Sequence, residues 1–270
     1  MFLTKKSIVK IAILAFCTLL LGTACVVLTF VLEDIGLDAP ALLSLGVAAY
    51  GLSILSVFWG SYAEGKGKLI NLGNQLVFKE LRPADFVNQY NFIRNGKDLV
   101  VAKPSFEVLQ LVAVAYEVLD DPDNLFETVN TLICLAKEKK RPYANLFKAS
   151  ELYQYGKIEE AEALFYEAQT HKLNALDKAF VDAIMKTDRA MAMGDYKTAE
   201  VRCLEILDSK YMQNNKLALL QAHDGLGQIY EKLQDNEKAI LHYQYCLVNG
   251  GETAIRKKAA KKLEELKTAV

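Results

Sequence analysis

The sequence predicts an all-α protein in which a two-helix transmembrane hairpin is followed by an array of stacked α-hairpins. Two long segments near the N-terminus, 11–32 and 39–63, contain no charged residue. Helix pairs in the C-terminal half share one pattern of small and bulky residues at a period of 38 and then 40 residues, which is typical of a helical repeat. Strand patterns are nearly absent, and Leu99-Val100-Val101 is the only short extended candidate.

Both apolar segments are long enough to cross a membrane, because a helix rises ~1.5 Å per residue and the hydrocarbon layer is ~30 Å thick. The spans 11–32 and 39–63 are separated only by the acidic loop 33–38. Basic residues next to a span tend to stay in the cytoplasm, and they occur here in 1–10 and again in 64–82. We therefore expect a multi-pass protein of the plasma membrane, with both termini cytoplasmic and the short loop extracytoplasmic.

Small residues on the second span provide a packing face for this hairpin. Ser44, Ala48, Gly51 and Leu55 recur at helical spacing, and small residues let membrane helices approach closely. We expect this face to contact the first span.

An alternative interpretation is a cleaved signal, because Gly22-Thr23-Ala24-Cys25 is similar to a lipoprotein cleavage site. The apolar run continues to Leu32, which is longer than an ordinary signal requires, and a leucine is expected in place of Gly22. A lipidated repeat protein that faces outward therefore remains the alternative to the two-span hairpin.

The remainder of the chain divides into a juxtamembrane helical linker (64–104), a divergent helical pair or cap (105–140), and repeats that end in a basic helix (142–270). Apolar periodicity and the Gly, Pro and Asp breakers between segments set the expected helix ends. The expected helices are 82–95, 105–119, 124–139, 145–157, 158–172, 180–193, 196–207, 217–233 and 236–247.

The second helix of each repeat carries the same spacing of side chains: a small residue, a bulkier one four positions later and a further one three positions after that. The matching triplets are Ala161, Phe165 and Ala168, then Ala199, Cys203 and Ile206, then Ala239, Tyr243 and Cys246. In the last unit these follow Leu226-Gly227 and Tyr230. This part of the chain resembles the tetratricopeptide-repeat (TPR) family, although the family unit is shorter, at 34 residues.

The resemblance implies a curved array whose inner surface is lined by the first helix of each pair. The inner positions that it implies are Tyr143, Leu146, Ser150, Tyr153, Val181, Ile184, Asp188, Met191, Gln221, Asp224, Gln228 and Glu231. They grade from apolar and aromatic to acidic, and they lack the Lys, Arg and Asn with which some family members grip a terminal carboxylate. A protein or peptide partner with apolar anchors and a basic end fits this surface. The alternative is that the apolar members are plain core.

Charge and motifs exclude several other functions. The chain has 32 basic and 33 acidic residues, of which 1–60 hold three each, so the repeats carry no excess of positive charge for nucleic acid. Residues 60–67 approach a phosphate-loop pattern, but Gly67 stands where a hydroxyl is needed. His242 and Cys246 share a helix face, yet two ligands are too few for a metal site. The five cysteines form no C-x-x-C pair and are expected to be buried free thiols.

The sequence therefore favours a non-enzymatic, membrane-anchored adaptor or scaffold that needs no cofactor and binds a protein or peptide partner at the membrane face. One alternative is a factor that assembles or regulates other membrane proteins through its hairpin. The other is the lipidated, outward-facing repeat protein.

Overall fold

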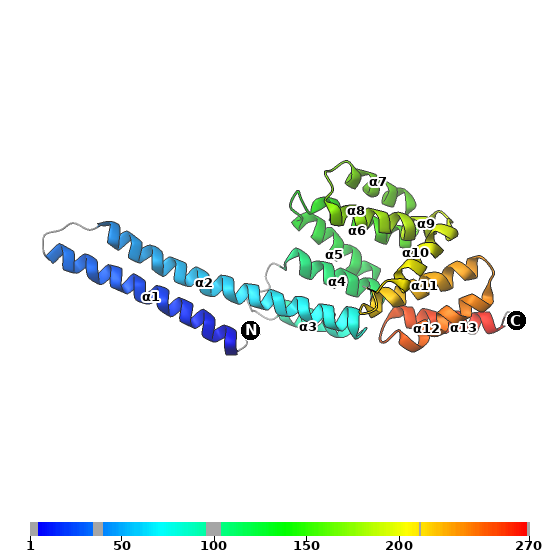
Figure 1. The fold of residues 1–270 in the computed structure, drawn as a ribbon, viewed down its shortest axis with the longest axis horizontal. Coiled ribbons are helices and arrows are strands. Elements are labelled where there is room, and N and C mark those ends of the chain that lie inside the picture. Colours follow the sequence, from blue (N-terminus) through cyan, green and yellow to red (C-terminus); the bar gives the residue numbers. More distant parts are fainter. Residues whose placement is uncertain (1–4, 35–39, 96–103, 211, 269–270) are drawn as a thin grey trace. The chain divides into compact units, whose positions relative to one another are not determined.

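Helices form every regular element that the computed structural model describes, which covers residues 5–34, 40–95, 104–210 and 212–268. The all-α prediction is therefore confirmed for the described residues. The chain divides into two units, Met1–Leu69 with Gly96–Lys103, and Ile70–Asn95 with Pro104–Val270 (Figure 1). The extended candidate at 99–101 lies outside the described residues.

The first unit is an antiparallel helix pair, α1 (Lys5–Asp34) and α2 (Pro40–Gly73), which lie side by side in Figure 1. The Thr23 and Tyr50 hydroxyls are 3.0 Å apart and form a hydrogen bond between the two helices. Thr29 is buried, and its Oγ1 donates to the Cys25 carbonyl at 2.8 Å. The hydroxyl groups of Thr23, Tyr50 and Thr29 in this helix pair are therefore hydrogen-bonded.

The packing face expected on α2 is wrong. Ser44, Ala48, Gly51 and Leu55 are all exposed, and a Cβ added at Gly51 would meet nothing within 4 Å. The buried residue is instead Ala49, which is rotated by about 100° from Ala48 on the helix. Sequence spacing identifies a stripe of small residues but does not indicate whether it faces inward.

One stretch of the described residues, Ala15–Leu32, is long and apolar enough to cross a membrane. No stretch of α2 qualifies within that part of the chain, so the two-span prediction is supported for the first span alone. The near phosphate-loop segment 60–67 is continuous helix within α2 and forms no loop.

The second unit begins with the end of α2 and a π-helix, and residues 70–95 pack into it rather than form a linker. Leu76, Val77, Phe86 and Tyr90 are buried there. The expected helix ends mostly agree with the structure to within a few residues. The elements are η1 (Asn74–Lys79), α3 (Pro83–Asn95), α4 (Phe106–Leu119), α5 (Pro122–Leu135), α6 (Arg141–Gln154), α7 (Ile158–Gln169), α8 (Ala175–Ile184), η3 (Met185–Arg189, also a π-helix), α9 (Ala190–Ala192), α10 (Tyr196–Asp208), α11 (Lys216–Lys232), α12 (Asn236–Asn249) and α13 (Ala254–Thr268).

Four hairpins, α4–α5, α6–α7, α8–α10 and α11–α12, turn in the same way. Each first helix ends in a residue with left-handed backbone: Asp120 (φ 58°), Gly156 (φ 71°), Gly194 (φ 77°) or Gln234 (φ 60°). The next N–H then bonds to the carbonyl five residues back, over 2.8–3.0 Å, in the Schellman arrangement. The turns are 36, 38 and 40 residues apart, so α4–α5 belongs to the same repeating series.

The second helices place the same three positions in the core. Residues four, eight and eleven after each helix cap are buried, apart from the half-buried Ile206. The triplets are Leu125, Val129 and Leu132 in α5; Ala161, Phe165 and Ala168 in α7; Ala199, Cys203 and Ile206 in α10; and Ala239, Tyr243 and Cys246 in α12. In α11, Gly227 lies against Tyr243, and a Cβ added to the glycine would come within 2.6 Å of the ring.

Gly227→Ala should therefore destabilise the second unit, by about 1–3 kcal/mol, because the aromatic ring has to shift in a packed core. Thermal unfolding of the purified chain in detergent, followed by circular dichroism, would show a melting temperature lower by several degrees. The matched control is Gly67→Ala, where the added methyl meets nothing within 4 Å. Equal melting temperatures for the two variants would contradict this packing.

Candidate functional site

The structure places the twelve predicted inner-face residues in three environments. Leu146, Ser150, Tyr153 and Ile184 are buried; Gln221 and Gln228 are exposed; Tyr143, Val181, Asp188, Met191, Asp224 and Glu231 are half-buried. Leu146, Tyr153 and Ile184 join Phe165 in one hydrophobic cluster, so these three positions contribute to the core. Glu231 accepts hydrogen bonds from Tyr243 and Lys262.

A cluster of carboxyl groups lies where the first helices of the hairpins meet. We call Glu117 of α4, Glu151 of α6 and Asp188 of η3 the acidic cluster. Ser150 Oγ donates to Asp188 Oδ2 over 2.5 Å, and Gln221 Nε2 donates to Glu117 Oε1 over 2.9 Å. The second bond joins residues 104 positions apart, and so it brings the first hairpin against the fourth. Sequence analysis identified Asp188 but missed both glutamates.

Burial acts on all three carboxyl groups, and repulsion from neighbouring carboxylates adds to it at Glu117 and Glu151. Burial, followed by the charge of Asp188, raises the pKa of Glu117 to about 7. Burial raises the pKa of Glu151 well above its usual range, and the charges of Glu117 and Asp188 add to this effect. Burial also raises the pKa of Asp188 to about 6, against the opposing hydrogen bonds from Ser150 and Thr187. Neighbouring carboxylates that lack a counter-ion shift in this direction.

Glu151 is the least compensated member of the acidic cluster. Its side chain is 1% exposed, and its Oε2 has no hydrogen-bond partner among the described residues. A buried polar atom left in this state costs about 1–3 kcal/mol. Within the described part of the chain, no lysine, arginine or histidine is among the groups that shift the three pKa values.

Another carboxylate of the second unit, that of Glu162, is fully paired. Glu162 accepts from Arg189 Nε over 2.6 Å and from the Tyr153 hydroxyl over 2.5 Å. Its pKa is lowered, chiefly by the hydrogen bond from Arg189. Among the described residues, the absence of such a cation is therefore particular to the acidic cluster.

Charged residues from α11 and α13 form the edge of the acidic cluster. Burial raises the pKa of Asp224 to about 6, while Gln228 and Lys258 act in the opposite direction. Lys258 Nζ lies 3.1 Å from Asp120 Oδ2, in the turn after α4. The Tyr155 hydroxyl donates to the other oxygen of Asp120 over 3.4 Å. Lys258 is therefore already paired with Asp120 at the edge of the acidic cluster.

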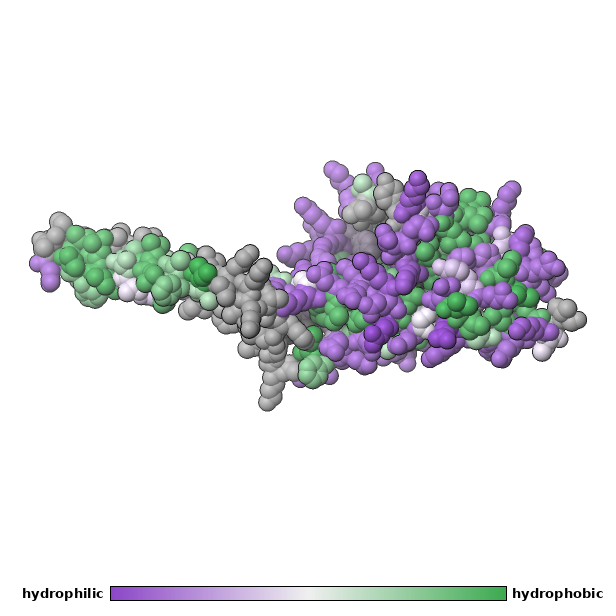
Figure 2. Space-filling view, turned by 60° about the horizontal axis from the view of Figure 1, so that its bottom comes forward, coloured by the Kyte–Doolittle hydropathy of each residue, from purple (hydrophilic) through white to green (hydrophobic). Residues whose placement is uncertain are grey.

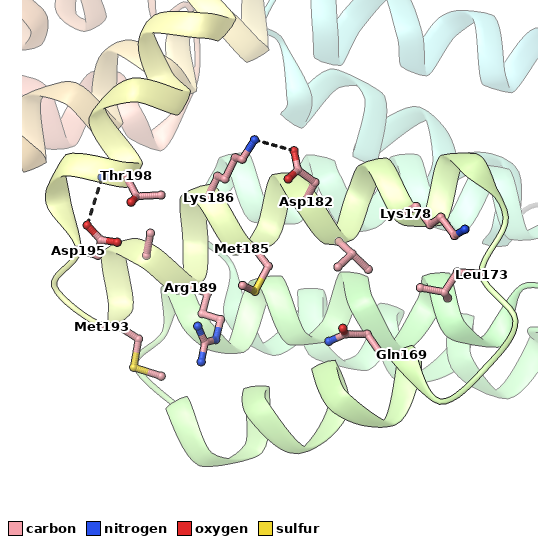
Figure 3. A pocket seen from close by; sticks show the side chains of 12 residues that line it. Gln169, Leu173, Lys178, Asp182, Met185, Lys186, Arg189, Met193, Asp195 and Thr198 are labelled. Atoms are coloured by element: carbon pink, nitrogen blue, oxygen red, sulfur yellow. Dashed lines mark hydrogen bonds and ion pairs between the residues drawn. The ribbon is translucent and has the colours of Figure 1, made fainter.

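A separate pocket of about 640 Å³ lies among α7, α8, η3 and the start of α10 (Figure 3). Leu173, Met185 and Met193 give it an apolar lining. Its lysine and arginine groups are largely neutralised by internal partners, as in the pair of Lys186 with Asp182 at 3.1 Å. The π-helix η3 thus contributes to two surfaces, the pocket and the acidic cluster, and π-turns often occur at functional positions.

Two histidines that are distant in sequence meet between α11 and α12. The Nδ1 atoms of His223 and His242 are 2.9 Å apart, and His223 stacks on Tyr245 with ring centroids 3.7 Å apart. Burial lowers the pKa of His223 to about 4 and also lowers that of His242, so both rings are neutral at pH 7. Cys246 packs in the core, with its Sγ donating to the Leu220 carbonyl over 3.7 Å.

The described residues contain no group of three or more ligating side chains placed to hold a metal ion. All five cysteines are free thiols. Cys203 and Cys246 are buried as expected, whereas Cys17 and Cys134 are exposed, so the prediction of buried thiols is wrong for those two.

Comparison with protein-family models, with curated proteins and with solved structures finds no match to this chain. A functional assignment consequently depends on the geometry of the site.

The raised pKa of Glu151 has a consequence for stability. A folded-state pKa above the unfolded value means that the folded protein binds more protons, so this contribution to stability falls as pH rises through that interval. Glu151→Gln should therefore raise the melting temperature at pH 7.5 by about 2–4 °C for each kcal/mol gained. The gain should shrink at pH 4.5, where the carboxyl group is protonated in the folded state.

The control for this measurement is Glu127→Gln on the exposed side of α5, which should change little at either pH. A gain from Glu151→Gln that is equal at both pH values, or a loss at pH 7.5, would contradict the assignment of a destabilised carboxyl group.

Proposed function

We propose that this chain is a non-enzymatic, membrane-anchored adaptor whose helical-repeat unit binds a protein or peptide partner. The observation that carries the proposal is the acidic cluster, where the first helices of the hairpins meet around carboxyl groups that have no counter-ion among the described residues. Stacked α-hairpins are commonly interaction surfaces, and the resemblance to tetratricopeptide repeats supports the same role. The exposed Gln221 and Gln228 and the half-buried Asp224 extend the surface along α11.

The side chains of the helix pair support the membrane anchor. Phe16, Leu20 and Phe30 on α1, and Val47 and Leu52 on α2, are each more than half exposed. Apolar side chains therefore face outward while hydroxyls face the seam, as lipid requires of a helix pair. Figure 2 shows the apolar surface along this unit.

The distribution of basic residues supports a cytoplasmic repeat unit, because lysines precede the first apolar segment and follow the second. An anchored adaptor confines its partner to a thin layer at the membrane, which raises the effective concentration without any additional contact.

Labelling of the exposed Cys134 tests this topology. A membrane-impermeant maleimide should label Cys134 only after the cells are permeabilised. A cysteine introduced by Gly36→Cys in a Cys134→Ser chain should be labelled in intact cells, because residues 33–38 form the predicted outer loop. Labelling of Cys134 in intact cells would contradict the orientation and favour the outward-facing, lipidated alternative.

Position-specific photo-crosslinking in native membranes tests the partner surface. A photo-reactive amino acid at Gln228, on the edge of the acidic cluster, should give one discrete crosslinked product. The same amino acid at Gln244, on the exposed side of α12, should not. Equal products at both positions, or none at Gln228, would count against the proposal.

A second candidate function is supported by the outward face of α2. Ser44, Ala48 and Gly51 are exposed to the surroundings of the helix pair, where small residues would allow another membrane helix to approach. In that case, the photo-reactive amino acid should give its discrete product at Gly51 and not at Gln228.

A further inference from the structure

In the part of the chain that the structure describes, no positively charged side chain compensates the acidic cluster. The charges of Glu117 and Asp188 both act on Glu151, and the buried Oε2 of Glu151 has no partner among the described residues. Elsewhere in the same unit, Arg189 compensates Glu162 with two hydrogen bonds. The cluster therefore has the acceptors of an ion-pair network but no cation of its own in the described chain.

The arrangement of the three carboxyl groups indicates which kind of cation fits the acidic cluster. Within the described residues, no group of three or more ligating side chains is placed to hold a metal ion, so the three carboxyl groups do not form a metal site. A guanidinium is larger and planar, and its five N–H donors can reach several carboxylates at once. The acceptors belong to α4, α6 and η3, so they approach the ligand from different helices.

We propose that the acidic cluster receives one arginine side chain from the partner segment, whose guanidinium donates to Glu117, Glu151 and Asp188. This inference rests on the proposed adaptor function and names the partner chemistry of that site. The exposed Gln221 already holds Glu117 by a hydrogen bond, so that carboxyl group is oriented before the ligand arrives.

Binding of the guanidinium should release protons from the carboxyl groups of the acidic cluster. The titratable and charged groups that face the cluster are Asp120 from the turn after α4, Tyr155 from the end of α6, Cys203 from α10, Asp224 from α11 and Lys258 from α13. Burial raises the pKa of the Cys203 thiol to about 11, so it stays neutral over this range. Lys258 is held by Asp120, so the carboxyl groups of the cluster are the ones that must lose protons. The affinity for a guanidinium should consequently increase between pH 5.5 and pH 7.5.

Calorimetric titration of the full chain in lipid nanodiscs with argininamide tests the proposal, and citrullinamide serves as the uncharged isostere. Argininamide should bind saturably at pH 7.5, with an affinity at least about tenfold above its own value at pH 5.5 and above that of citrullinamide. Glu151→Gln should weaken binding at least about tenfold, because one charged acceptor is lost. Glu127→Gln should bind as the wild type does, and melting temperatures would verify that both variants are folded.

Several results would overturn the inference: no binding of argininamide to the wild type, equal binding of citrullinamide, or unchanged binding to folded Glu151→Gln. Lysinamide that binds as tightly as argininamide would overturn the preference for a guanidinium. If argininamide does not bind but the crosslinked product at Gln228 is still formed, this inference is wrong and the adaptor function is retained. Argininamide binding without any crosslinked partner would indicate a site for a free cation and remove the adaptor function.

Discussion

The turn within each α-hairpin is the constraint on which the second unit depends. A residue in the left-handed conformation, followed by a Schellman hydrogen bond, ends one helix and starts the next within two residues. The two helices must then lie antiparallel, and each presents a fixed set of side chains to its neighbour. A single hairpin cannot bury this set alone, so the four hairpins stack and share one series of core positions.

Stacking of this kind fixes where the polar residues of the first helices go. The hydrogen bond from Gln221 of α11 to Glu117 of α4 links the fourth hairpin to the first, and burial raises the pKa of the three carboxyl groups of the acidic cluster. The π-helix η3 interrupts the third hairpin at the point that supplies Asp188.

Local patterns predicted much of this fold, because helix ends depend on nearby residues. The breaks at Gly156, Gly194 and Gln234-Asp235, and the buried triplets of the second helices, follow from spacing alone. Glu117 and Glu151 could not be found in this way, because their proximity requires contacts between distant hairpins. The pairing of His223 with His242 depends on tertiary packing for the same reason. On α2, a register difference of one residue decided which small residues are buried.

In both units, many polar side chains have hydrogen-bond partners within the fold. In the helix pair, the hydroxyls of Thr23, Tyr50 and Thr29 all have partners in the seam. In the second unit, half-buried carboxylates such as Glu162 and Glu231 also have partners. Glu151 lacks this compensation, because its Oε2 is buried without a hydrogen-bond partner among the described residues and the charges of two further carboxyl groups act on it. A group that destabilises the isolated fold at neutral pH supports the proposal of a ligand that compensates it, as strain retained at a binding site is compensated on binding.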